Sequence, residues 1–263
     1  MKSIVNRKVA TAKAAFQNGG ASALAVLVKN YLQLLRARAI GIEIDGCRFK
    51  VRRLTKDFWH GIVSGEYESS ERQAIRQYLD PRHPVIELGG CLGVVTCILN
   101  RFLESPRMHV VVDASPECAR TIKANAARNK CDVVVVNAAI AYNCDNVVFW
   151  VNPDRPYSNA LQPIHPGCSQ ISVPATTLKA LCEEYGVSGC SLVCDIEGQE
   201  YEMVKNELPL IAQCVTSMIL ETHPRLIGTE KTEEMLAALA SVGFQIRDVI
   251  DDVYVLMRPQ GRS

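Results

Sequence analysis

Short apolar runs that alternate with helical segments are the feature that most limits how this chain can fold. The runs include PVIEL, MHVVVD, CDVVVV, CSLVCD and TSMILET. Such continuous apolar character is typical of parallel strands that are covered by helices on both faces. The last two runs, FQIRDVI and VYVLMRP, are joined by two aspartates and predict a hairpin. We therefore predict an α/β fold with a mostly parallel sheet, helices on both faces and a C-terminal antiparallel hairpin.

Three local features refine this prediction. Ser70 and Gln73 have the spacing of a capping box at the start of a helix. The run over residues 131–141 is so uniformly apolar that we expect a strand that is not half exposed. The proline-rich segment PDRPYSNALQPIHPGCSQ predicts a loop that frames a site. Its Tyr157, Asn159 or His165 would help to select the substrate.

The first 42 residues differ from the rest, because they are basic and the first acidic residue is Glu43. We predict a helical N-terminal leader over residues 1–42 and a single domain over residues 43–263. The leader is expected to pack on the domain, with contact to an anionic membrane surface or a transit peptide as open alternatives. Its apolar stretch ASALAVLVKNYLQLL is interrupted by Lys29 and is too short to span a bilayer.

Charge and cysteine content narrow the possible partners. A net charge of +1 gives no general attraction for nucleic acid, so we expect no nucleic-acid partner. Eleven cysteines are an odd number, no C-x-x-C pair occurs, and the thiols fall within apolar runs. This pattern favours a reducing compartment, and we expect a cytoplasmic protein. The oligomeric state is not predicted.

Polar and small residues follow the first three predicted strands, at the edge where open parallel sheets bind ligands. Gly89 and Gly93 belong to the turn ELGGCLG and would let a ligand approach the backbone. Asp113, with Ser115 beside it, would accept the hydroxyl protons of a ribose. Asn137 and the two alanines after it would admit an adenine ring. The sequence therefore predicts an adenosine site.

The glycine pattern selects among adenosine cofactors. Neither the dinucleotide pattern G-x-G-x-x-G nor a Walker motif is present. Glu87, two residues before the first glycine, suits a cofactor whose tail carries a positive amino group. We therefore predict S-adenosylmethionine, held by the residues assigned above and by Asp195 from the next strand end: Glu87, Gly89, Gly93, Asp113, Ser115, Asn137 and Asp195.

Two further strand ends carry the residues expected to do chemistry. Asp195 and Glu197 follow one strand, and Glu221 and His223 follow the next. We predict that Asp195, Glu197 and His223 converge beside the cofactor, with His223 as the general base. Glu200 and Glu202 are interpreted as acids that complement the dipole of the following helix. No metal site is predicted, although a divalent metal held by Asp195, Glu197 and Glu221 stays open as the less favoured alternative.

The chain also resembles the FkbM-type methyltransferase family. The resemblance rests on VIELGGCLG, VVDASPECARTIKANAARN, TTLKAL, LVCDIEGQEYEMV, ILETHP and LASVGFQI, and on the preceding segment GEYESSE. It implies a Rossmann-like class I methyltransferase with a seven-stranded sheet. It also implies methyl transfer from S-adenosylmethionine to a hydroxyl of a sugar, glycoconjugate or other natural product. The chain departs from the family at Glu87, Cys91 and Asp113, where Asp, Asn and Glu are usual.

Two other functions remain open at this point. One is an NAD(P)-dependent oxidoreductase on a Rossmann sheet, which is disfavoured by the glycine pattern. The other is a protein that binds S-adenosylmethionine without catalysis, because Cys91 departs from the family pattern within the predicted cofactor turn. The expected partner of the leading hypothesis is a small-molecule or carbohydrate acceptor.

Overall fold

The computed structural model describes Ala25 and residues 41–50, 61–62, 64–105, 108–151 and 168–259, and every structural statement below concerns these residues. The predicted leader and the proline-rich segment, which includes Tyr157, Asn159 and His165, lie outside them except for Ala25, residues 41–42 and residues 168–170.

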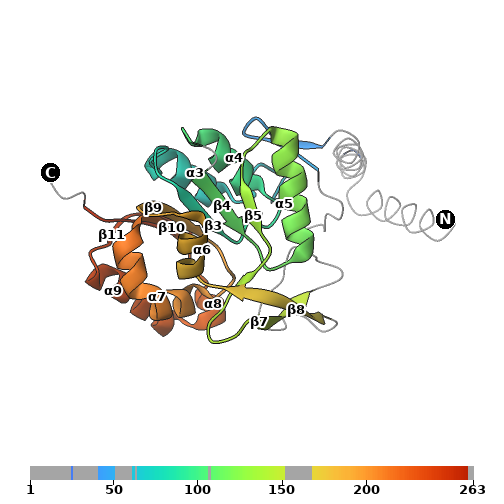
Figure 1. Cartoon of the computed structure of the whole chain (residues 1–263). Coiled ribbons are helices and arrows are strands. Elements are labelled where there is room, and N and C mark those ends of the chain that lie inside the picture. Colours follow the sequence, from blue (N-terminus) through green and yellow to red (C-terminus); the bar gives the residue numbers. More distant parts are fainter. Residues whose placement is uncertain are drawn as a thin grey trace.

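A seven-stranded sheet forms the centre of the described structure (Figure 1). Its order is β11-β12-β10-β9-β3-β4-β5, and only β12 runs against its neighbours β10 and β11. The predicted mostly parallel, Rossmann-like sheet with a C-terminal antiparallel hairpin is thereby confirmed. The strands are β3 (Val85–Leu88), β4 (His109–Val112), β5 (Val134–Val136), β9 (Cys190–Cys194), β10 (Val215–Glu221), β11 (Gln245–Ile250) and β12 (Val253–Met257).

Side-chain alternation along the strands builds a core on each face of this sheet. Val85 and Val193 pack with α3 and α4, whereas Ile86 and Leu192 pack with α6, α7 and α9 on the other face. The helices on the first face are α3 (Ser69–Tyr78), α4 (Val94–Phe102) and α5 (Pro116–Asn129); the others are α6 (Leu178–Tyr185), α7 (Glu200–Cys214), α8 (Pro224–Ile227) and α9 (Thr229–Ser241). Because both faces are covered, the central strands can be apolar throughout.

The helix ends show where local sequence reasoning succeeds and fails. Ser115 caps α5, since its Oγ accepts a hydrogen bond from the Cys118 amide at 3.3 Å. The predicted capping box of Ser70 and Gln73 is wrong. The residue before α3 is Glu68, which has a left-handed backbone (φ 49°) and makes no capping bond. Ser70 instead donates a hydrogen bond to Asp251 in the C-terminal hairpin, so a tertiary contact replaces the local one.

Two small sheets flank the central one. β1 (Ile42–Ile44) and β2 (Cys47–Phe49) form an antiparallel hairpin. Asn129 pairs with both the amide and the carbonyl of Arg48, and thereby ties β2 to α5. A second sheet of order β6-β8-β7 contains β6 (Ala139–Ile140), β7 (Asn146–Val151) and β8 (Ser169–Thr176).

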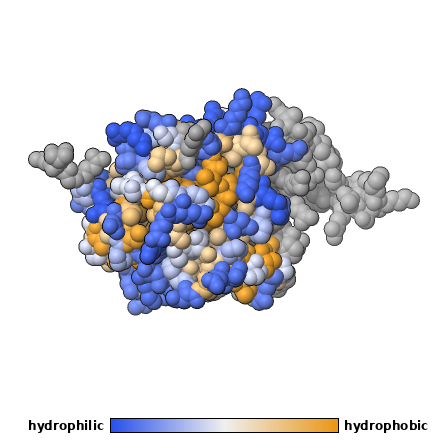
Figure 2. Space-filling view, viewed as in Figure 1, coloured by the Kyte–Doolittle hydropathy of each residue, from blue (hydrophilic) through white to orange (hydrophobic). Residues whose placement is uncertain are grey.

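The strand expected over residues 131–141 differs from the prediction. It divides into β5 and β6, and β5 is the edge strand of the central sheet. Val134 is accordingly exposed rather than buried. Figure 2 shows apolar side chains over the middle of this face of the molecule, surrounded by hydrophilic ones. The apolar run therefore predicted a strand correctly, but it could not show that this strand lies at the edge of the sheet, with a neighbouring strand on one side only.

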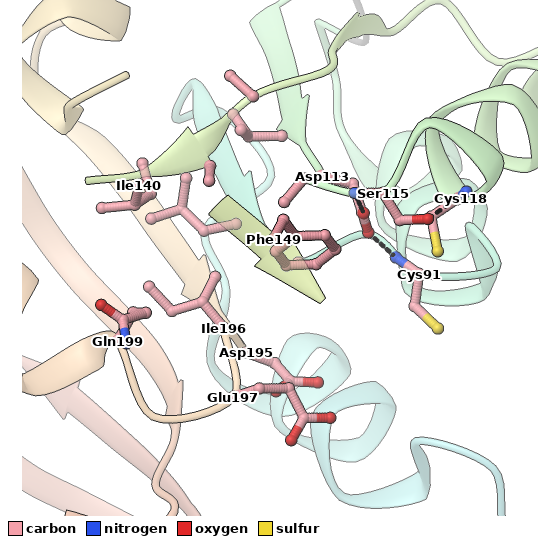
Figure 3. Close-up of a pocket in the computed structure, with 16 residues that line it drawn as sticks. Cys91, Asp113, Ser115, Cys118, Ile140, Phe149, Asp195, Ile196, Glu197 and Gln199 are labelled. Atoms are coloured by element: carbon pink, nitrogen blue, oxygen red, sulfur yellow. Dashed lines mark hydrogen bonds between the residues drawn. The ribbon is translucent and has the colours of Figure 1, made fainter. Parts of the chain in front are cut away.

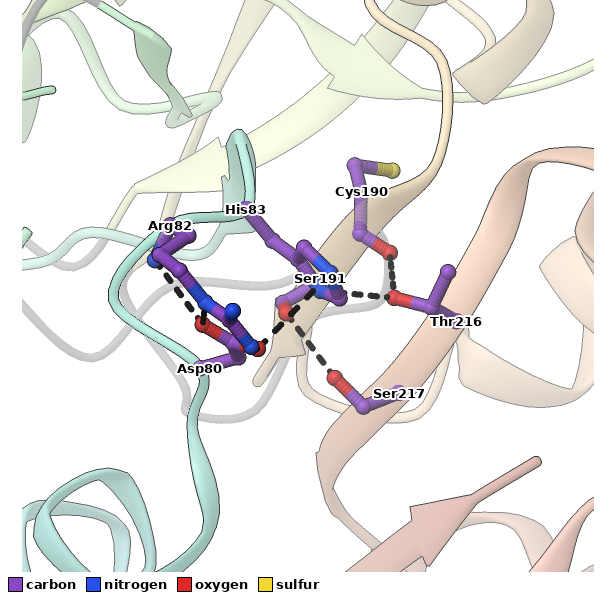
Figure 4. A network of polar contacts seen from close by, with 7 residues as sticks. All are labelled: Asp80, Arg82, His83, Cys190, Ser191, Thr216 and Ser217. Atoms are coloured by element: carbon purple, nitrogen blue, oxygen red, sulfur yellow. Dashed lines mark hydrogen bonds and ion pairs between the residues drawn. The ribbon is translucent and has the colours of Figure 1, made fainter. Parts of the chain in front are cut away.

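Polar contacts hold the strand ends at the rim where β9 and β10 begin (Figure 4). The Thr216 hydroxyl donates to the Cys190 carbonyl at 3.1 Å and lies 3.2 Å from Nδ1 of His83. The hydroxyls of Ser191 and Ser217 share a hydrogen bond of 2.8 Å between the two strands. This rim is the one opposite Asp195 and Glu221. In the described part of the chain, no helix has the length and apolarity that crossing a bilayer requires.

Candidate functional site

A pocket opens at the carboxyl ends of β3, β4 and β9 (Figure 3). It encloses about 730 Å³ of free space, part of which is continuous with solvent. Among the residues predicted to form the site, five line this pocket: Gly89, Asp113, Ser115, Asp195 and Glu197. Apolar walls come from the central sheet, from the sheet β6-β8-β7 and from the turns beside them: Leu88, Val112, Ala114, Ala138, Ala139, Ile140, Phe149 and Ile196.

Asp113 sits at the end of β4 with both carboxylate oxygens held by backbone amides. Oδ2 accepts from the Cys91 amide and Oδ1 from the Ser115 amide, each at 2.8 Å (Figure 3). Burial raises the pKa of this carboxyl to about 7, although the two amide bonds oppose the shift. Asn137 does not line the pocket; its Nδ2 donates to the carbonyls of Asp113 and Ala114 and fixes the turn from behind.

The glycines of the turn after β3 have different tasks. Gly89 lines the pocket with a φ of +92°, and a Cβ there would lie 1.6 Å from the carbonyl oxygen of Asp195. Gly93 is the N-cap of α4 (φ +75°) and faces Ile122, so it serves helix packing and does not line the pocket. At position 89, only glycine lets the turns after β3 and β9 approach this closely, because it has no Cβ.

The structure turns the Glu87 carboxylate away from the pocket. Glu87 is buried on the α4 face of the sheet, where Oε1 accepts from Thr96 at 2.8 Å and Oε2 lies 2.9 Å from Nε2 of His109. It also borders a narrow gap behind Gly89, together with Glu68 and Glu71. The predicted direct contact between Glu87 and the cofactor is therefore not what the geometry favours. Sequence spacing did not reveal that alternation along β3 sends this side chain to the helix face.

His223 meets three carboxylates where β9 and β10 end. Its Nε2 lies 3.4 Å from Asp195, 3.8 Å from Glu197 and 4.0 Å from Glu221. The structure therefore brings Asp195, Glu197 and His223 together. The backbone from Asp195 to Glu197 is not extended as expected, because Glu197 has a left-handed conformation with a φ of 53°. This turn, rather than strand alternation, directs Glu197 to the others.

Glu200 is the residue of this group that sequence reasoning missed. Its side chain is 0% exposed, and Oε1 lies 3.1 Å from Nδ1 of His223 while accepting from the Ile196 amide at 2.8 Å. The interpretation of Glu200 as a helix-dipole acid is thus incomplete, because the residue also faces the imidazole. The signal was its place in the DIEGQE segment, five residues after Asp195.

Crowded carboxylates dominate the electrostatics of this rim. Burial, followed by the charge of Glu197, raises the pKa of Asp195 to about 8. Burial and a hydrogen bond with Glu71 raise the pKa of Glu221 to about 10. Burial alone would lower the pKa of His223, but Glu200 and the neighbouring carboxylates raise it to about 9. A positively charged group would be stabilised here.

Comparisons with known proteins identify the family. The methyltransferase FkbM domain matches residues 87–246, which is more than half of the chain. No curated protein sequence matches. Similar solved structures include a ribosomal protein L11 methylase from Lactobacillus delbrueckii subsp. bulgaricus, at 14% identity and a TM-score of 0.44, covering 72% of this chain and 77% of that one. Another is TYW2 from M. jannaschii in complex with AdoMet, at 10% identity and a TM-score of 0.42, covering 81% of each chain.

The match to the family agrees with the resemblance seen in the sequence and decides between a methyltransferase and an oxidoreductase. The chain belongs to the FkbM methyltransferase family and is an S-adenosylmethionine-dependent methyltransferase.

Proposed function

We propose that the protein methylates a hydroxyl group of a sugar, glycoconjugate or other natural product. The observation that carries this proposal is the convergence of Asp195, Glu197 and His223 at the end of a pocket whose other end holds Asp113. One end offers hydrogen-bond acceptors for a ribose, and the other offers groups that can bind a hydroxyl and remove its proton. The near-zero net charge supports a small-molecule or carbohydrate acceptor rather than nucleic acid.

The residues of the pocket fit the methyl donor. Each Asp113 oxygen accepts one amide bond, and a carboxylate oxygen has a second lone pair that can accept from a ribose hydroxyl. Ala138, Ala139 and Phe149 give an apolar wall of the kind that an adenine ring requires. Gly89 leaves room for close approach to the backbone. When bound, S-adenosylmethionine supplies a methyl carbon on a positively charged sulfur, which the acidic rim would stabilise.

The acidic rim would act on the acceptor. Asp195 and Glu197 would hold its hydroxyl in place, and positioning of this kind supplies much of the rate gain in a displacement reaction. Nε2 of His223 would accept the hydroxyl proton, a contribution of about 10²- to 10⁴-fold. A positive charge brought beside the carboxylates would lower the raised pKa of His223 towards neutrality and so free this nitrogen.

The reaction can be tested with a donor whose methyl group carries ¹³C, incubated with the protein and pooled small-molecule and glycoside extracts. We expect label in a product whose methyl ¹³C chemical shift is that of an O-methyl ether. His223→Gln should lower turnover by about 10²-fold or more, while its affinity for S-adenosylhomocysteine stays within about twofold. Asp113→Ala should instead weaken S-adenosylhomocysteine far more than the acceptor.

Other outcomes would contradict the proposal in distinct ways. Label that appears only as N-methyl or S-methyl groups would contradict the hydroxyl acceptor while leaving the methyltransferase assignment intact. Full activity of His223→Gln on the true acceptor would show that another group removes the proton. Equal losses of donor and acceptor affinity in Asp113→Ala would contradict the ribose assignment.

A further inference from the structure

Three carboxylates from three separate elements lie close to one another beside His223. Glu71 comes from the first turn of α3, Asp195 follows β9, and Glu221 ends β10. One carboxylate oxygen from each lies within 4.8 Å of the others. Oxygens bound to one divalent ion at about 2.0–2.4 Å are at most about 4.8 Å apart, so a single ion can contact all three.

Burial makes this cluster different from a group of acids on the surface. Glu71 is only 7% exposed, and its carboxyl faces the other acids and hydrogen-bonds with Glu221. Oδ1 of Asp195 is buried and makes no hydrogen bond in the part of the chain that the structure describes, although Nε2 of His223 lies 3.4 Å from it and the Asp195 side chain as a whole is 30% exposed. A buried carboxylate oxygen without a donor is costly unless a proton or a cation reaches it.

Acidic groups are in surplus over basic ones around the cluster, and the raised pKa values of Asp195 and Glu221 keep these two protonated at neutral pH until a cation binds. Glu68, Glu197 and Glu200 lie at the same rim. The ion pairs of the acids at this rim are all made with His223 in the part of the chain that the structure describes. Across the described ranges, no lysine or arginine pairs with any of these six carboxylates. The methyl donor carries a net charge of +1, which leaves most of the surplus in place.

We propose that Glu71, Asp195 and Glu221 bind a divalent metal ion through their carboxylate oxygens. An all-oxygen set favours a hard cation such as Mg²⁺ or Mn²⁺, which keeps open positions for water or substrate. This proposal differs from the sequence prediction, which favoured no metal, and it places Glu71 rather than Glu197 in the set.

The location suggests what the ion does. Asp195 Oδ1 lies 3.4 Å from Nε2 of His223, so the cluster adjoins the proposed base. An acceptor hydroxyl bound to the ion would have a lowered pKa and would give its proton to His223. This task rests on the proposed function, whereas metal binding itself does not.

Mn²⁺ serves as the probe, because its free concentration can be followed by electron paramagnetic resonance on the full-length protein without donor or acceptor. We expect about one Mn²⁺ per chain, in competition with Mg²⁺. Glu71→Gln and Glu221→Gln should each weaken Mn²⁺ binding at least tenfold. Glu197→Gln, which alters the neighbouring acid, and Glu233→Gln, which alters an exposed glutamate on α9, should change it less than threefold.

Thermal melting gives a second readout that does not depend on activity. Glu71→Gln removes repulsion between buried carboxylates, so the metal-free variant should melt no lower than the wild type. Saturating Mn²⁺ should raise the melting temperature of the wild type by several degrees and leave that of the variant within about one degree. This comparison also shows that the variant folds.

Several results would overturn the metal site. One is that the wild type does not bind Mn²⁺ at millimolar concentration. Another is that Glu71→Gln binds Mn²⁺ as well as the wild type does, and a third is that Glu197→Gln loses Mn²⁺ binding while Glu71→Gln keeps it. A fourth is that the wild type does not bind Mn²⁺ while Glu71→Gln weakens the binding of S-adenosylhomocysteine but not that of 5′-methylthioadenosine, which lacks the amino acid tail. The cluster would then bind the donor's ammonium. None of these results alters the test for O-methyl product.

Discussion

Gly89 shows how one residue joins two strand ends into a site. Its missing Cβ allows the turn after β3 to contact the carbonyl of Asp195. That contact sets the distance between the turn after β3 and the carboxylates after β9, and both line one pocket. Glycine in the motif is therefore required by the neighbouring backbone as well as by a ligand.

Replacement of Gly89 by alanine should be severely destabilising. The new Cβ would meet the Asp195 carbonyl at 1.6 Å in a left-handed backbone, and we expect a loss of at least about 3 kcal/mol of unfolding free energy. S-Adenosylhomocysteine should no longer raise the melting temperature. Gly186→Ala is the matched control, because Gly186 is also left-handed (φ +63°) but has open space around it.

The control should lose only about 1 kcal/mol, which is the cost of a left-handed alanine. That loss corresponds to about 2–4 °C in melting temperature. Similar losses in the two variants would contradict the argument, since the close contact with Asp195 would then have no effect.

Asp113 predicts a pH dependence of cofactor binding. Burial raises its pKa to about 7 in the protein without ligand, and ribose hydroxyls are bound best by the ionised form. Affinity for S-adenosylhomocysteine should therefore rise as pH increases through about 7 and level off above it, by several-fold between pH 6 and pH 8. Titration calorimetry across this range provides the measurement.

Asp113→Asn cannot ionise, so its weaker affinity should be flat over the same range. The raised pKa has a second consequence. Folding favours the protonated carboxyl, so its contribution to stability is complete below about pH 4 and is lost as pH rises through about 7. Binding that tightens as pH falls would contradict the assignment of Asp113 to the ribose.

At the scale of elements, helix α7 is anchored by a buried acid at its kink. Glu207 has a non-helical backbone, two residues before Pro209. Its carboxylate accepts from the amides of Leu178 and Lys179 at 2.9 and 2.7 Å, and from the Tyr142 hydroxyl at 2.6 Å. One side chain thus caps α6 and fastens both helices to the loop after β6.

Removal of this anchor should cost more than an ordinary glutamate substitution. Glu207→Ala leaves the buried Leu178 amide without its acceptor, and we expect a loss of about 3–5 kcal/mol in unfolding free energy by urea denaturation. Glu233→Ala on the exposed side of α9 should stay within about 0.5 kcal/mol. If both variants unfold at the same urea concentration, α6 and α7 do not depend on this contact.

The elements also show how far the sequence could predict this fold. Helix α5 begins at Pro116, directly after its capping residue Ser115, and a start signal of this kind is local to the sequence. The sharing of one rim by Asp113, Asp195 and His223 followed from strand direction alone. The direction of Glu87, the left-handed turn at Glu197 and the exposure of Val134 depend on tertiary neighbours, which no spacing encodes.

At the scale of the molecule, the sheet separates chemistry from support. The rim with Asp113 and His223 carries strained turns, crowded acids and a pocket. The opposite rim carries satisfied hydroxyl contacts, between Ser191 and Ser217 and from Thr216 to the Cys190 carbonyl (Figure 4). At about 3.3 Å per residue, a strand of five residues such as β9 places the two rims roughly 15 Å apart.

This separation makes the two rims independent under mutation. A Ser191→Ala and Thr216→Val double variant removes contacts between β9 and β10 at their starts, and it should lower the unfolding free energy by about 1–2 kcal/mol. Its affinity for S-adenosylhomocysteine should stay within about twofold, because substitutions more than about 10 Å from a site usually act independently. Asp113→Asn should show the opposite pattern, with weaker binding and little change in stability at neutral pH. Calorimetric titration and urea denaturation on the same samples distinguish the two patterns. If the double variant loses affinity as strongly as Asp113→Asn, then the central strands transmit changes between the rims and the sheet is not a rigid support.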